Sequence, residues 1–103
     1  MPYQAPVSEY QFIFDQVVPL APVVANACFS EATQDLTDAV LSECGKMCDT
    51  VMAPLQRPGD LHPARLENGV VRTPPGFSDG YAAIVESGWV GISATPEQGG
   101  MGL

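Results

Sequence analysis

The chain of 103 residues has the length of one domain or of part of a larger one, and its 46% hydrophobic and 16% charged residues are typical of a folded protein. Twelve acidic residues against four basic ones give a net charge of −8, which repels phosphate backbones and anionic membrane surfaces and argues against nucleic-acid binding. No apolar run reaches the roughly 20 residues of a spanning helix, so membrane insertion is not expected.

The N-terminal part of the sequence predicts an extended stretch and then a short helix. Two prolines in residues 1–7, MPYQAPV, indicate extended backbone. The helix is expected over residues 8–18, with Ser8 as its cap and Pro19 as its end. Its apolar face must dock on another surface, because the helix is short and the face is broad: Tyr10, Phe12, Ile13, Phe14 and Val17. Residues 19–30 are expected to be irregular.

The main helix is expected from about Glu31 to Met52, with Pro54 closing it. One apolar stripe recurs at helical spacing: Leu36, Val40, Cys44, Met47, Val51 and Leu55. The solvent-facing side is expected to hold the charged residues Asp35, Asp38, Glu43, Lys46 and Asp49. Gly45 in the middle of this helix costs about 1 kcal/mol relative to alanine, which suggests that another segment approaches closely there.

The three cysteines, Cys28, Cys44 and Cys48, do not have the spacing of a disulfide framework. Together with the lack of a visible secretory signal, they favour free thiols in a cytoplasmic protein. Cys44 and Cys48 stand one helical turn apart and could supply two metal ligands, but a third ligand is hard to find. Packing as small hydrophobic side chains is the simpler interpretation, so no metal site is predicted.

Residues 56–76 hold four prolines and three glycines and are expected to be irregular. The pair Asn68-Gly69 predicts a turn between two very short extended pieces. His62 could act as a general base, but no nucleophile or orienting partner is identifiable, so a solvated loop histidine is the simpler interpretation. Arg65 and Arg72 could take an anionic ligand, although scattered arginines are usually surface charges.

A second helix is expected next, with Ser78 or Asp79 as its cap and Gly88 just past its end. Its apolar face is Tyr81, Ile84 and Val85, and Trp89 opens a short apolar run. Phosphate-loop and dinucleotide fingerprints and catalytic triads are absent from the sequence. These elements predict a mostly helical, all-α chain with irregular connections rich in proline and glycine.

The order of the segments resembles the N-terminal helical domain of acyl-CoA dehydrogenases. A loop of the form GD…LENGVVRTPPGF is followed by a short helix and then by GWVGISATPEQGGMGL. In that family a Gly-Trp pair leads through an apolar run to Pro-Glu and then to Gly-Gly-x-Gly. Gln98 stands where many members carry an aromatic residue. The motif positions in this chain are Gly88, Trp89, Pro96, Glu97, Gly99, Gly100 and Gly102.

The opening YQAPVSEYQFIF resembles the extra N-terminal segment of a longer subset of the family, which includes bacterial enzymes acting on unusual thioesters such as 3-methylmercaptopropionyl-CoA. The resemblance implies an N-terminal extension with a short helix over residues 1–30. It implies a partial helical bundle, the beginning of the dehydrogenase helical domain, over residues 31–103, cut at the turn that leads into the next helix. The motif is then expected to be a structural turn near the acyl pocket.

The resemblance implies that the longer protein binds FAD and oxidises an acyl-CoA thioester to the 2,3-enoyl-CoA. It also implies electron transfer to an electron-transferring flavoprotein and a homo-oligomeric assembly. In the family the catalytic base and most flavin contacts lie in later domains, so no catalytic residue is assigned here, neither Glu86 nor Glu97. The chain alone is expected to bind no FAD and to be inactive.

The alternative is a protein of another class. A free-standing helical interaction module would pair with a partner through the surface of Tyr10, Phe12 and Phe14.

Overall fold

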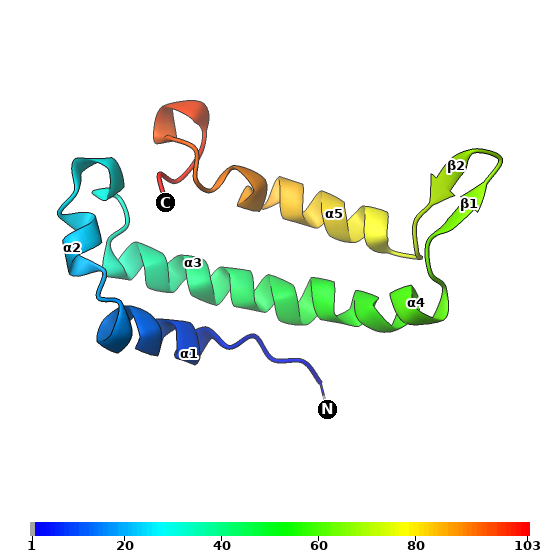
Figure 1. Cartoon of the computed structure of the whole chain (residues 1–103), viewed down its shortest axis with the longest axis horizontal. Helices are drawn as coiled ribbons and strands as arrows, with labels where there is room; N and C mark the ends of the chain where they lie inside the picture. The colour runs from blue at the N-terminus through cyan, green and yellow to red at the C-terminus, as the bar shows by residue number, and fades with distance from the viewer. Residues whose placement is uncertain (1) are drawn as a thin grey trace.

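The computed structural model describes residues 2–103 and shows a flat layer of helical segments (Figure 1). A long central rod has one helical segment along each side, and both flanking segments run opposite to it. The layer measures 53 × 36 × 18 Å, and its radius of gyration is 17.2 Å, against about 13 Å for a compact domain of 100 residues. No large side chain of residues 2–103 is fully buried. The fold is mostly helical, which confirms the predicted class, with one two-stranded sheet in addition.

The first flanking segment begins with extended residues and continues as α1 (Val7–Phe12) and a π-helical turn (Ile13–Val17). The predicted short helix before Pro19 is confirmed. Its predicted cap is wrong, because Pro6 occupies the cap position and the Ser8 hydroxyl donates instead to the neighbouring Glu9 carboxylate, at 3.1 Å.

The stretch expected to be irregular holds the short helix α2 (Ala21–Val24) and a 3₁₀ turn (Ala27–Phe29). Pro22 lies in the first turn of α2, where its missing N–H removes no helical hydrogen bond. The expectation of irregular backbone is therefore wrong for residues 21–24 and 27–29, because a proline in the first turn can start a helix.

The rod begins with α3 (Gln34–Met47), where the Thr33 side chain accepts a hydrogen bond from the Leu36 N–H at 3.3 Å. The main helix is thus confirmed, but the prediction that Pro54 ends it is wrong. A π-helical turn (Cys48–Met52) and a 3₁₀ turn (Ala53–Leu55) carry the rod through the proline into α4 (Gln56–Leu61). The expectation of irregular backbone from residue 56 is therefore wrong for α4. A regular helix would bring the proline ring against an earlier carbonyl, and the widened turn before it relieves that conflict.

The N-terminal segment is fastened to the rod at three places. The Ala5 N–H donates to Asp49 at 2.7 Å, and the Gln11 amide donates to Asp38 at 3.2 Å. Between them, a Cβ added to Gly45 would lie 2.6 Å from a Val7 methyl carbon. The close approach expected at Gly45 is therefore confirmed. The prediction of a wholly solvent-facing charged side is wrong for the two aspartates, which are half-buried under this segment.

The other flanking helix, α5 (Phe77–Glu86), follows Gly76, whose φ of 82° makes it the cap in place of the predicted Ser78 or Asp79. It packs on the rod through another glycine contact. The Leu55 side chain fills the space where Gly80 lacks a Cβ, and a Cβ on Gly76 would also lie 2.8 Å from it. The Ser87 and Gly88 N–H groups bond back to the helix, and Gly88 has a φ of 79°, which confirms the predicted C-terminal glycine.

Strands β1 (Arg65–Glu67) and β2 (Val70–Arg72) form an antiparallel hairpin with Leu66 opposite Val71. Asn68 and Gly69 join them with φ angles of 50° and 76°, as a two-residue turn with positive φ at both positions requires. The predicted turn between two short extended pieces is confirmed.

We predict that Gly45→Leu releases the N-terminal segment from the rod. Leucine is a good helix former, so any loss of stability reports the contact with Val7 and not the helix propensity of residue 45. The overpacking should lower the free energy of unfolding by about 1–3 kcal/mol. Thermal unfolding and limited proteolysis near Val7 measure the effect.

The matched control is Ala39→Leu, on the same helix but at an exposed position. It should change stability by no more than about 0.5 kcal/mol. Equal behaviour of the two variants would contradict the role of Gly45.

Candidate functional site

The motif residues lie together in one closed loop at the end of the chain, after α5. The loop contains two 3₁₀ turns, Trp89–Gly91 and Pro96–Gln98. The backbone then folds back on itself: the Met101 N–H donates to the Ile92 carbonyl at 3.1 Å, and the Gly102 N–H donates to that of Ala94 at 2.9 Å. The sequence pattern therefore marks a compact turn.

Glycine is required within this loop for two different reasons. Gly99 and Gly102 have φ angles of 84° and 67°, a region that other residues rarely adopt. Gly100 has no room for a side chain, because a Cβ there would collide with the Ala94 carbonyl and lie 2.5 Å from the Gly91 carbonyl oxygen. These glycines fix the path of the backbone.

Trp89 contributes a hydrogen-bond donor that lacks a partner. Its ring is half-buried, and its Nε1 is fully shielded from solvent but meets no acceptor within residues 2–103. An unsatisfied buried donor costs roughly 1–3 kcal/mol. Glu97, in contrast, is exposed at the surface of the loop. The loop therefore holds neither a paired nor a buried carboxylate that could serve as a base.

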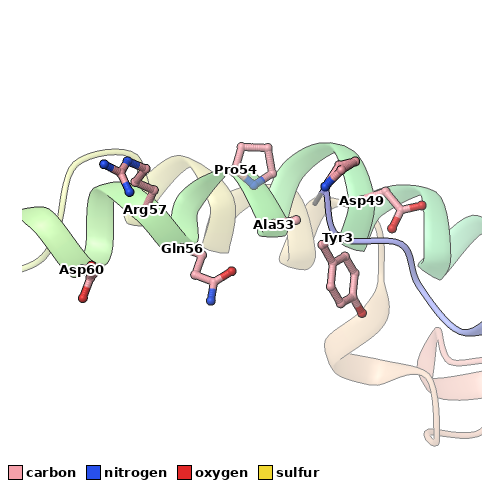
Figure 2. Close-up of a pocket in the computed structure, with 8 residues that line it drawn as sticks. Tyr3, Asp49, Ala53, Pro54, Gln56, Arg57 and Asp60 are labelled. Atoms are coloured by element: carbon pink, nitrogen blue, oxygen red, sulfur yellow. The ribbon is translucent and has the colours of Figure 1, made fainter.

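The larger of two open grooves between the N-terminal residues and the rod is lined by none of the motif residues (Figure 2). It has a volume of about 770 Å³, and Figure 2 shows its side chains spread along the helix. Arg57 is the cation among them, and Asp49 and Asp60 are the acids. Sequence reasoning gave this groove no role, since nothing in the sequence pattern connects residues 2–3 with 49–60. The groove shows no nucleophile paired with a base.

The other residues considered for ligand binding or catalysis either pair with a neighbouring carboxylate or lie exposed on their own. Glu67 accepts a hydrogen bond from Arg65 at 2.6 Å and lies 3.7 Å from Arg72, so both arginines already have a carboxylate partner. His62 is an exposed residue at the end of α4. No three His, Cys, Asp or Glu side chains of residues 2–103 lie close enough together to hold a metal ion.

The cysteine pair consists of half-buried free thiols in contact with one another. Burial raises the pKa of the Cys44 thiol above its ordinary value, and the neighbouring Cys48 raises it further through charge repulsion and a hydrogen bond. Metals bind the thiolate, so this shift opposes metal binding near neutral pH. The packing interpretation of the pair agrees with this chemistry.

No helix in residues 2–103 is long and apolar enough to cross a membrane. No family model matches the chain. Comparison with individual proteins nevertheless relates the chain to the acyl-CoA dehydrogenases, as the order of its motifs predicts. Over all 103 residues it is 41% identical to the 3-methylmercaptopropionyl-CoA dehydrogenase of Ruegeria pomeroyi. The chain spans 18% of the length of that relative.

We predict that Gly100→Ala opens the terminal loop. The added methyl group would meet backbone carbonyls, which cannot rotate away as a side chain can. Amide hydrogen exchange at Met101 and Gly102 should become faster. Gly91→Ala is the matched control, because a Cβ there meets nothing within 4 Å, and its exchange rates should stay unchanged.

We also predict that Cys44 is alkylated more slowly than the exposed Cys28 at neutral pH. The thiolate is the reactive form, and a raised pKa leaves less of it at neutral pH, so the alkylation rate should rise with pH. Mass spectrometry after iodoacetamide treatment measures both sites. Cys48→Ala should speed the reaction at Cys44, and an unchanged rate in that variant would contradict the coupling.

Proposed function

We propose that this chain is the N-terminal helical part of a longer FAD-dependent acyl-CoA dehydrogenase. The observation that carries the proposal is the 41% identity to a dehydrogenase over the whole chain. We propose residues 1–30 as the N-terminal extension, here with two short helices, and residues 31–103 as the beginning of the helical domain. The substrate class is an acyl-CoA thioester, and 3-methylmercaptopropionyl-CoA is the first candidate.

The exposed apolar surface supports the proposal that this chain is part of a larger protein. Phe12 is 61% exposed, Val17 61% and Tyr81 64%, so both flanking helices leave large side chains uncovered. An 18 Å thick layer cannot bury both faces of its helices, since two stacked layers are needed to enclose a core. The same surface would be covered if further domains packed against this one.

We propose that residues 2–103 do not form a flavin site on their own. The larger groove is open, and its single arginine is accompanied by two aspartates, whose charge disfavours a diphosphate group. FAD in the full-length enzyme would accept the hydride that leaves the β carbon of the acyl chain. The role proposed for the motif residues is to fix the backbone turn near the acyl pocket, with Trp89 as a packing anchor.

The proposed partners of the longer protein are its acyl-CoA substrate, an electron-transferring flavoprotein and further copies of itself. We propose the cytoplasm as its location. These proposals depend on the relationship to the dehydrogenase.

A second candidate is an interaction module that pairs through the surface of α1. The exposure of Tyr10 and Phe12 favours it, whereas Phe14 is half-buried and leaves less surface than expected. Gene length separates the two candidates. The reading frame of the dehydrogenase should continue past Leu103, and a natural stop codon directly after it would refute the first proposal.

We predict that the full-length protein oxidises an acyl-CoA in the presence of an artificial electron acceptor, and that residues 1–103 alone do not. Profiling with thioesters of different acyl chains, including 3-methylmercaptopropionyl-CoA, gives the substrate. The isolated chain should also lose FAD on a desalting column. Clear flavin retention by the isolated chain would show that the cofactor site is assigned to the wrong part of the enzyme.

A further inference from the structure

The β1–β2 hairpin projects from one end of the layer (Figure 1). Every residue of both strands is exposed, including Leu66 at 72% and Val71 at 64%. Each strand has three residues, and an isolated two-stranded hairpin is marginally stable in water. The hairpin therefore opens at a lower free-energy cost than the helices do.

The tip of this hairpin places an asparagine side chain next to an unprotected glycine nitrogen. Asn68 and Gly69 are both exposed, and a Cβ on Gly69 would meet nothing within 4 Å. The Gly69 N–H donates to no backbone carbonyl of residues 2–103. Neither a side chain at residue 69 nor a backbone hydrogen bond obstructs the approach of this nitrogen to the asparagine amide when the turn opens.

We propose that Asn68 is a site of spontaneous covalent modification in the folded protein. The Gly69 nitrogen attacks the Asn68 amide carbon, a new C–N bond forms, and ammonia leaves to give a cyclic succinimide. Water then adds to either carbonyl and opens the ring to aspartate or isoaspartate. The sequence of steps requires water alone and no change in oxidation state, and it is independent of the proposed dehydrogenase function.

The product changes both the charge and the backbone of the turn. It adds a carboxylate next to Glu67, which already accepts a hydrogen bond from Arg65 and lies near Arg72. Isoaspartate also inserts one extra carbon into the main chain. A two-residue turn tolerates no extra backbone atom without loss of register, so the pairing of Glu67 with Val70 is lost first.

The chain carries its own internal controls. Asn26, the other asparagine, precedes Ala27, and its side-chain oxygen accepts the Cys28 N–H at 3.1 Å. Asp79-Gly80 has the same kind of glycine neighbour but lies in α5, where the Gly80 N–H donates to the Gly76 carbonyl at 2.9 Å. Both sites are held by hydrogen bonds that the hairpin tip lacks.

The test is a time course of the folded protein in mildly alkaline buffer, followed by trypsin digestion. Cleavage after Arg65 and Arg72 releases the peptide 66–72, in which Asn68 is the third residue. We expect its amide-to-acid mass change, and its labelling by an isoaspartate methyltransferase, to accumulate at least roughly tenfold faster than at Asn26. Time-zero digests correct for changes during digestion.

The control variant is Asn68→Gly, which keeps positive φ at the turn and removes the amide. It should give no label in this peptide while other sites stay unchanged. The proposal is overturned if Asn68 and Asn26 change at equal rates. It is also overturned if a synthetic peptide 65–72 is modified while the folded protein is not, because the folded turn would then protect the site.

Discussion

The contact between Leu55 and Gly80 is the interaction on which the arrangement of the layer depends. A leucine side chain occupies the space that a Cβ would otherwise fill, so helix and rod approach more closely than ordinary side chains allow. The same principle operates on the other side, where Val7 lies over Gly45. With so little buried side-chain volume, these two close approaches replace a conventional core, and the rest of the packing is shallow.

Sequence periodicity predicted the parts of the fold that depend on local backbone chemistry. The helical stripe beginning at Leu36, the turn at Asn68-Gly69 and the glycine after α5 were all predicted from spacing and φ preference. Pro54 was misread because a proline blocks a regular helix, whereas a widened turn lets the helix continue. Asp38 and Asp49 looked solvent-facing because their partners come from a segment some 27 and 44 residues earlier. No local pattern encodes such contacts.

In the candidate site, too, features set by neighbouring residues could be predicted from the sequence, whereas contacts between distant residues could not. The preference of glycine for unusual backbone positions is a local property of the sequence: Gly99 has a positive φ, and Gly100 lies against backbone carbonyls. The unpaired indole of Trp89 was not foreseeable, because it depends on which acceptors surround the ring. Identity over the whole chain relates it to a dehydrogenase, whereas the base and the flavin contacts of the longer enzyme are proposed to lie outside these 103 residues.

The widened turn at Cys48–Met52 also changes the angular phase of the rod. Gly45 and Leu55 are ten residues apart, and on a regular helix they would point about 80° away from each other. One extra residue in the π-helical turn makes them equivalent to nine regular steps, or about 180°, and the tighter 3₁₀ turn Ala53–Leu55 takes back part of this change. The two contact points then face opposite flanks, as the positions of α1 and α5 require (Figure 1). The one extra residue in this turn thus lets a single helical rod pack against a different segment on each of two sides.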